Sequence, residues 1–134
     1  MTPFDLKIVT PYGLIYDGQA EELIVRSTSG DLGILAGHMD CVAPLGMGRA
    51  TIVVEGRKRY AACIGGMVSV IGSKVTLVPT TFEWAEDIDI QRAEASHARA
   101  RAVLDDRTST DTEIRLAEAR LKRALVRKSI GTMK

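Results

Sequence analysis

The sequence has few of the residues that catalytic sites, metal sites and disulfide frameworks need. Its 134 residues include only two histidines and two cysteines. Cys41 and Cys63 lie in apolar segments without CxxC spacing, which favours a buried free thiol over a disulfide. No HExxH, GxSxG or P-loop pattern is present, and Gly46-Met47-Gly48 lacks the third glycine of a dinucleotide fingerprint. The residues therefore predict no metal site, and they favour a protein that is not an enzyme by itself.

Long apolar runs and a strong net charge are also lacking. The longest uncharged stretch, 60–73, is too short to span a bilayer and contains Gly65-Gly66. The N-terminus runs directly into an alternating segment instead of a signal peptide. A formal net charge of +1, without basic residues interleaved with aromatics, argues against a nucleic-acid-binding module. We expect a soluble cytosolic chain that reaches a membrane only through partners.

Helix-breaking residues are missing from most of the second part of the chain. Of the 12 glycines and four prolines, none lies between Thr80 and Ile130. The chain thus divides into a turn-rich first part and a helix-compatible second part. We expect two domains, 1–84 and 85–134, with a hinge between Thr81 and Asp89.

The first part contains about ten short β-type segments separated by turn residues. Alternation is clear in Lys74–Val78, where Val75 and Leu77 share one face. The pattern predicts an antiparallel β-sandwich or flattened barrel, and hence an α+β fold with the helices at the C-terminal end. The expected strands are 4–9, 13–16, 21–28, 33–35, 40–45, 49–54, 59–64, 67–71, 74–78 and 81–84.

The second part follows a helical period and predicts an antiparallel two-helix hairpin. Asp87 or Asp89 can cap the first helix, and Thr110 with Glu113 forms a capping box for the second, which should end near Lys128. A short polar loop, 105–109, joins the helices. The apolar stripes are Ile90, Ala93, His97, Ala100 and Leu104 on the first helix, and Ile114, Ala117, Leu121 and Leu125 on the second.

Alanine dominates the seam between the two expected helices. Burying a methyl group stabilises little compared with the roughly 1.5–3 kcal/mol from a leucine or isoleucine. Two interpretations follow: a weakly docked arm that a ligand can move, or an ordinary hairpin that stabilises the domain.

Three passages carry a resemblance to a known family. Phe4–Gly13 reads FDLKIVTPYG, Gly30–His38 fits Gly-acid-x-Gly-(Ile/Val)-Leu-x-x-His, and Ile88–Ala93 fits (Ile/Leu)-Asp-x-x-Arg-Ala. In this order and spacing they resemble the epsilon subunit of bacterial F-type ATP synthases, over the whole chain. Ala36, where the family usually has proline, and Asp40-Cys41-Val42 depart from its pattern.

The resemblance implies a non-catalytic rotor subunit of the central stalk in a proton-translocating synthase. It would sit on the cytoplasmic face of the cell membrane, peripherally, with the gamma subunit, the c-ring and the alpha/beta hexamer as partners. By position, Asp31 and His38 would face the c-ring and gamma. A histidine satisfied within its own loop is the alternative for His38.

The resemblance also implies that the hairpin inhibits ATP hydrolysis when it extends into the catalytic hexamer. The second helix would then meet an acidic segment of the beta subunits. A merely solvated basic face is the alternative. The residues assigned to this contact are Arg115, Arg120, Lys122, Arg123 and Arg127.

Some members of the family bind ATP without hydrolysing it, which implies a regulatory ATP site here. Asp89 would contact the adenine or ribose, and arginines would contact the phosphates. The alternative is that Asp89 only caps a helix and Arg92 only pairs with an acid. A free-standing ATP-binding sensor is the rival to the rotor function. The site would comprise Glu83, Asp89, Arg92, Ala93, Arg99, Arg123 and Arg127.

Overall fold

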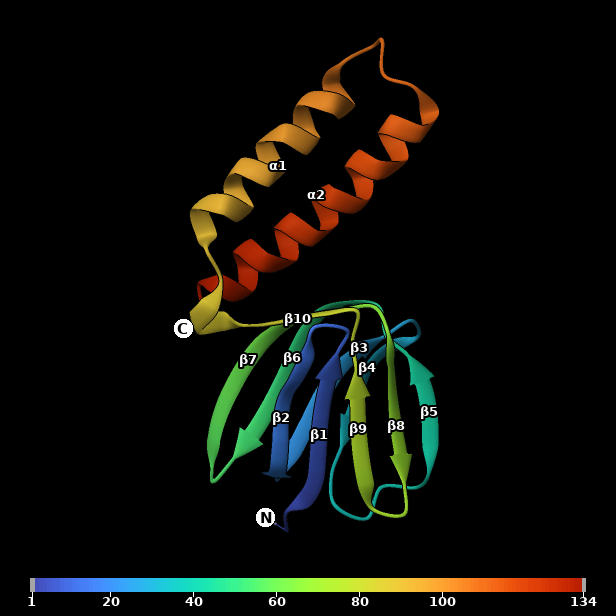
Figure 1. Cartoon of the computed structure of the whole chain (residues 1–134), viewed down its shortest axis with the longest axis vertical. Helices are drawn as coiled ribbons and strands as arrows, with labels where there is room; N and C mark the ends of the chain where they lie inside the picture. The colour runs from blue at the N-terminus through green and yellow to red at the C-terminus, as the bar shows by residue number, and fades with distance from the viewer. Residues whose placement is uncertain (1, 134) are drawn as a thin grey trace. The chain divides into compact units, whose positions relative to one another are not determined.

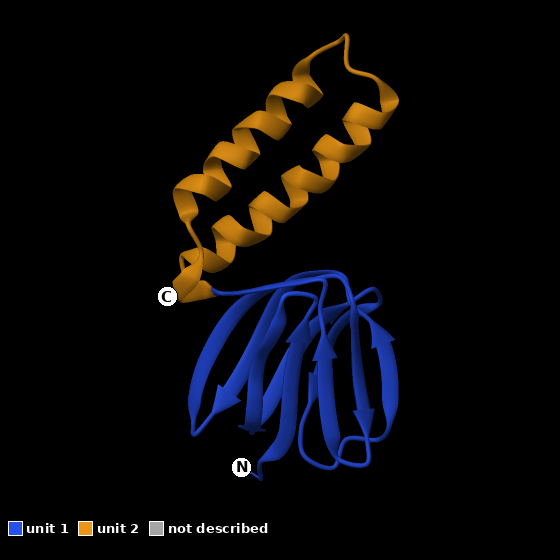
Figure 2. Cartoon of the chain, viewed as in Figure 1, with its two compact units in different colours: residues 1–84 blue, residues 85–134 orange. Residues whose placement is uncertain are grey.

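The computed structural model describes residues 2–133. The strands occupy the first part of the chain and the helices the last part (Figure 1). The chain separates into two compact units, one ending at Trp84 and the other beginning at Ala85 (Figure 2).

The first unit contains ten strands in two five-stranded sheets. Each strand overlaps an expected segment, although β2 is longer than expected and β4 begins three residues earlier. The strands are β1 (Phe4–Thr10), β2 (Gly13–Ala20), β3 (Glu22–Ser27), β4 (Gly30–Ile34), β5 (Cys41–Pro44), β6 (Met47–Val54), β7 (Arg57–Ile64), β8 (Met67–Ile71), β9 (Lys74–Val78) and β10 (Thr81–Trp84). One sheet has the order β2-β1-β9-β8-β5 and the other β10-β7-β6-β3-β4. The predicted sandwich is therefore confirmed.

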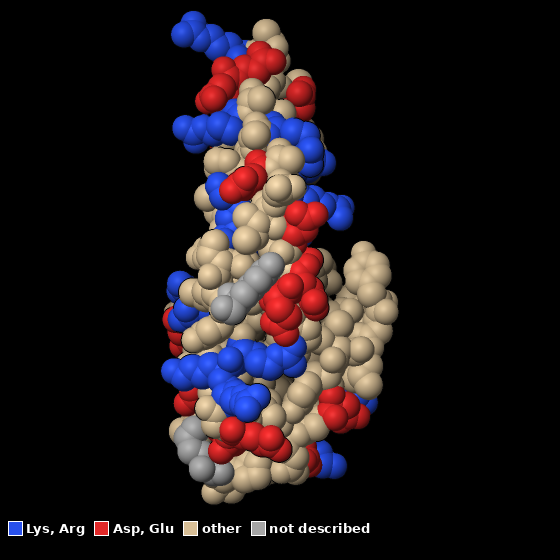
Figure 3. Space-filling view, turned by 90° about the vertical axis from the view of Figure 1, so that its left-hand side faces the viewer, with Lys and Arg blue, Asp and Glu red and all other residues tan. Residues whose placement is uncertain are grey.

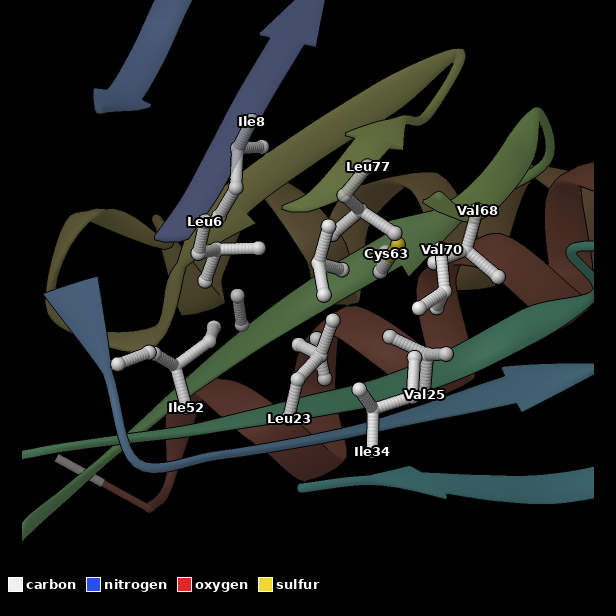
Figure 4. Packing of buried hydrophobic residues seen from close by; sticks show 14 of the residues in the cluster. Leu6, Ile8, Leu23, Val25, Ile34, Ile52, Cys63, Val68, Val70 and Leu77 are labelled. Atoms are coloured by element: carbon white, nitrogen blue, oxygen red, sulfur yellow. The ribbon is translucent and has the colours of Figure 1, made fainter. Parts of the chain in front are cut away.

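The core lies between the two sheets because alternate residues of each strand point inward. In β1, Leu6 and Ile8 are buried while Asp5 and Lys7 are exposed. Figure 4 shows Leu6, Ile8 and Leu77 from one sheet facing apolar side chains of the other. Cys63 is a free, buried thiol of this core, as expected, and burial raises its pKa to about 12. Each fully buried leucine or isoleucine contributes roughly 1.5–3 kcal/mol.

Two tight turns fix the register of neighbouring strands. Glu55 and Gly56 have φ values of 50° and 75°, and Gly72 and Ser73 have values of 56° and 67°. Positive φ at both central residues is the mark of a type I′ turn, whose twist matches that of an antiparallel hairpin. The two turns join β6 to β7 and β8 to β9.

One strand pair differs from the purely antiparallel arrangement that we expected. β1 pairs with β9 in parallel, with Leu6 opposite Val75 and Ile8 opposite Leu77. Alternation within a strand is the same for either orientation, so it does not reveal how two distant strands pair. The parallel pair connects the antiparallel β1–β2 pair to the β9-β8-β5 part of the same sheet.

The second unit contains a short 3₁₀ helix, η1 (Ala85–Asp87), and the helices α1 (Ile90–Asp105) and α2 (Asp111–Gly131). The carboxylate of Asp89 caps α1 by accepting a hydrogen bond of 3.1 Å from the Arg92 N–H. Thr110 and Glu113 form the predicted capping box. α2 continues past Lys128 to Gly131, so its predicted end was too early. Neither helix is long and apolar enough to cross a membrane.

Four alanines form the buried seam of the hairpin, as expected: Ala93, Ala100, Ala117 and Ala124. The stripe predicted for α2 is wrong at one position, because Leu125 is exposed and Ala124 takes its place in the seam. The other large stripe residues are half-buried, as is His97: Ile90, Leu104, Ile114 and Leu121. The fully buried part of the seam therefore contains no large apolar side chain among the stripe residues.

The best-packed part of the hairpin is its base, where α1 begins and α2 ends. Ile88 and Ile130 are buried there. A Cβ on Gly131 would lie 3.0 Å from both Ile88 Cγ2 and Ile90 Cγ1. This close approach accounts for the one glycine in the helical part of the chain.

Candidate functional site

The residues predicted to face the c-ring lie on strand β4 and in the loop that follows it. Asp31 lies near the start of β4 and is exposed, whereas His38 follows the strand and is half-buried. The His38 N–H donates to the Leu35 carbonyl at 3.1 Å, and the ring Nδ1 lies 2.7 Å from the Met39 carbonyl. Since a carbonyl only accepts, Nδ1 carries the proton of that bond. His38 is thus held within its loop, and its place in an interface stays a prediction.

An exposed apolar face that the sequence reading missed covers the outer side of β5, β8 and β9, which lie side by side (Figure 1). Cross-strand pairs share a face, and Met67 lies opposite both Pro44 and Val78. We define the apolar face as Val42, Pro44, Met67, Ile71 and Val78, all exposed. Ser69, Thr76 and Lys74 share this outer side, so the apolar side chains cluster most closely where Pro44, Met67 and Val78 are paired. An exposed apolar cluster is typical of an interaction site.

The apolar face continues across the sheet onto β1 and β2. Val9 follows Ile8, which pairs with Leu77, so Val9 lies beside Val78 on the outer side. Leu14 pairs with Val9 and is exposed. A signal was present in the sequence, because β8 is apolar on both faces and not only on the buried one.

The predicted ATP-binding residues fall in different surroundings. Arg92 and Arg99 are exposed and seven residues apart on α1, so they share one side of that helix. Asp89 uses Oδ1 to cap the helix. The Ala93 side chain is fully buried in the seam, away from any surface that a nucleotide could touch. Glu83 is half-buried in β10 and belongs to the other unit.

The basic residues of α2 lie on two sides of the helix. Arg115 and Lys122 are seven residues apart and share one side, whereas the spacing of Arg120, Arg123 and Arg127 places these three together on another. Figure 3 shows acidic side chains interspersed with basic ones over the visible side of the chain. The predicted inhibitory set is therefore not one continuous stripe.

Arg127 and Asp89 lie at the same end of the hairpin. Arg127 is one turn before Gly131, which approaches Ile88 and Ile90. Of the residues predicted to contact a nucleotide, the structure thus places Asp89, at the start of α1, and Arg127, near the end of α2, at the same end of the hairpin. At the opposite end, hydrogen bonds from Thr108 hold the pKa of Asp106 below its usual value.

The last residue of the first unit, Trp84, is anchored within that unit. The guanidinium carbon of Arg59 lies 3.6 Å from the centroid of the Trp84 ring, and Phe82 meets that ring edge-on at 4.9 Å. Arg59 also lies near Tyr16. Burial raises the pKa of the Tyr16 hydroxyl, and the positive charge of Arg59 partly opposes this rise. On the other side, Ala85 is buried. The boundary falls inside the segment expected to hinge; the motion itself stays a prediction.

Comparisons with known families cover almost the whole chain. Residues 3–85 match the family described as ATP synthase, Delta/Epsilon chain, beta-sandwich domain. Residues 86–129 match the long alpha-helix domain of the same family.

Curated relatives match over most or all of their length. An ATP synthase epsilon chain from Ruminococcus albus is 42% identical over 100% of both chains. One from Bacillus velezensis is 43% identical over 98% of both, and one from Bacillus subtilis is 44% identical over 86% of both.

Solved structures share the fold at low sequence identity. The structure of the Euglena gracilis mitochondrial ATP synthase, OSCP/F1/c-ring, contains a chain with a TM-score of 0.84 and 20% identity, covering 100% of this chain and 83% of that one. A chain of the Tetrahymena thermophila mitochondrial ATP synthase, central stalk/c-ring, gives 0.60 and 14%, covering 95% of both. With both domains matched in order and identities above 40% along the whole length, the chain belongs to the ATP synthase epsilon chain family.

Proposed function

We propose that the chain is a non-catalytic rotor subunit that couples gamma to the c-ring of a proton-translocating ATP synthase. Full-length identity to bacterial epsilon chains is the observation that carries this proposal. The Euglena and Tetrahymena neighbours come from F1/c-ring and central-stalk assemblies, which supports the same partners. The subunit would lie on the cytoplasmic face of the cell membrane, held there by the complex.

The apolar face is the surface that would pack on gamma. It is formed by rigid, paired strands, so little conformational freedom is lost on docking. Asp31 and His38 lie on and after β4, in the other sheet, where a more polar contact with the c-ring is expected.

Replacing Val78 with glutamate is expected to weaken binding to an alpha–beta–gamma complex at least tenfold. The change removes buried apolar area and places an unpaired charge in the interface, and about 1.4 kcal/mol already corresponds to tenfold. Val78 is 45% exposed, so the free subunit should still fold. Co-elution of purified proteins on size-exclusion chromatography, with titration, measures the affinity.

Leu35→Glu is the matched control, because Leu35 is 49% exposed and follows β4 in the other sheet. Without a c-ring in the mixture, this variant should bind like the unchanged chain. If the unchanged chain fails to join alpha, beta and gamma chains at all, the rotor function is wrong and a free-standing sensor is favoured.

A regulatory ATP site on the hairpin is the second candidate function. Two exposed arginines on one side of α1, Arg92 and Arg99, support it, because guanidinium groups bind phosphate in a bidentate manner. Bound ATP would stabilise the conformation that holds it by mass action. No other cofactor is required by the proposed function.

Isothermal titration calorimetry of the whole chain with ATP is expected to give a binding heat that disappears in the double variant Arg92→Gln, Arg99→Gln. Arg107→Gln in the exposed loop between the helices should leave the heat unchanged. No heat at millimolar ATP with the unchanged chain would remove the sensing function while leaving the rotor function intact.

A further inference from the structure

The stem of Arg26 packs closely against two glycines, Gly46 and Gly48. Its side chain crosses the segment that begins β6, and a Cβ on Gly48 would come within 2.7 Å of Arg26 Cβ and 3.1 Å of its Cγ. A Cβ on Gly46 would lie 3.6 Å from the same Cγ, and the Gly46 N–H donates to the Arg26 carbonyl at 2.9 Å. The Gly-Met-Gly segment thus has a structural role: it makes room for the stem of one arginine.

The arginine is directed at the carboxylate of Asp31. The two residues are cross-strand partners in the β3–β4 hairpin, and Arg26 Nε lies 3.4 Å from Asp31 Oδ1. Their side chains remain 52% and 66% exposed. An exposed ion pair adds almost nothing to folding stability, so stability does not account for this arrangement.

We propose that Arg26 is a positioning residue that orients Asp31 for its contact with the c-ring and itself binds the same partner loop. This inference rests on the proposed rotor function. The guanidinium has five N–H donors in a fixed fork, more than one carboxylate oxygen can use. The pair therefore offers an acceptor and donors side by side.

The partner that such a surface fits is a polar loop with groups of both kinds. A cation or N–H donor of the loop would meet the Asp31 carboxylate, and a carbonyl or carboxylate would meet Arg26. Because Arg26 holds Asp31 in place before binding, less side-chain freedom is lost when the complex forms.

The test measures binding of the reconstituted alpha–beta–gamma–epsilon complex to purified c-rings. Asp31→Asn is expected to weaken binding about five-fold and Arg26→Ala by more, because the latter also removes the contact of the arginine itself. The double variant should be no weaker than Arg26→Ala, because the contact of Asp31 depends on Arg26. Arg26→Lys should recover only part of the loss, since lysine keeps the charge without the fork.

Gly48→Ala keeps every charge but displaces the Arg26 stem, and it should weaken ring binding as Arg26→Ala does. Arg57→Ala, an exposed arginine in β7, is the control and should bind normally. Thermal unfolding of each free variant shows whether a loss of binding reflects a loss of fold.

Two outcomes overturn the inference while the rotor function stands: Arg26→Ala binding like the unchanged complex, or a double variant whose loss equals the product of the single losses. If the unchanged complex does not bind the ring, the proposed function fails as well.

Discussion

Replacing Gly66 with alanine is expected to destabilise the sandwich by more than about 3 kcal/mol, a large part of the roughly 5–15 kcal/mol by which native domains are stable. Gly66 has a φ of 87°, and a Cβ built there would lie 2.0 Å from the Val78 carbonyl oxygen and 2.7 Å from Pro79 Cα. Both neighbours are backbone atoms, so no side-chain rotation can relieve the clash. The Gly66 carbonyl also accepts a 2.8 Å hydrogen bond from the Leu45 N–H, which holds the loop in place.

Gly56→Ala is a control that carries the cost of a positive φ without a steric clash like the one expected at Gly66. Gly56 has a φ of 75°, but a Cβ there would meet nothing within 4 Å. This control should lose only about 1–2 kcal/mol, the cost of the left-handed conformation for a residue with a side chain. Urea unfolding followed by Trp84 fluorescence and circular dichroism measures both variants. Equal midpoints would contradict the steric argument.

Local features of the fold could be predicted because their causes are local. The Thr110–Glu113 capping box depends on residues three apart. Alternation in Lys74–Val78 gave the buried face of β9 correctly. Each of these patterns would act in the same way in any surrounding structure.

Features that depend on distant contacts could not be predicted. The parallel pairing of β1 with β9 joins segments more than sixty residues apart. Leu125 fits a helical stripe by spacing, yet the neighbouring helix meets Ala124, because alanine permits a closer approach. The need for glycine at position 131 arises from its packing against Ile88 and Ile90, which its neighbours in the sequence do not indicate.

The residues of the candidate sites also differ in whether their surroundings depend on local sequence or on distant contacts. Motif matching placed Ala93 in a nucleotide site, whereas its side chain belongs to the buried seam. The family resemblance assigns Asp31 to the c-ring contact, but its pairing with Arg26 depends on the register of β3 and β4. The apolar face arises from three strands together; the sequence of β8 signals its own exposed apolar side chains, but the neighbours that complete the face depend on strand pairing.

If the hairpin inhibits ATP hydrolysis by extending into the catalytic hexamer, as the family resemblance implies, reversing four charges on α2 is expected to abolish that inhibition. In the variant Arg120→Glu, Lys122→Glu, Arg123→Glu, Arg127→Glu, attraction to an acidic segment of the beta subunits becomes repulsion. The hydrolysis rate of the alpha–beta–gamma complex with this variant should equal the rate without the subunit. Arg57→Glu with Lys58→Glu on β7, both exposed, should leave inhibition intact.

The two sides of α2 permit a sharper version of this experiment. Arg115 and Lys122 form one side, and Arg120, Arg123 and Arg127 form the other. If the contact is made by one side of the helix, reversal of that set alone should restore hydrolysis, and reversal of the other set should leave inhibition nearly unchanged. Inhibition that falls in proportion to the number of reversed charges, whichever side they occupy, would indicate long-range attraction and should weaken with salt. Inhibition that no reversal changes would exclude an electrostatic contact and would place the inhibitory role on the apolar side chains of the hairpin.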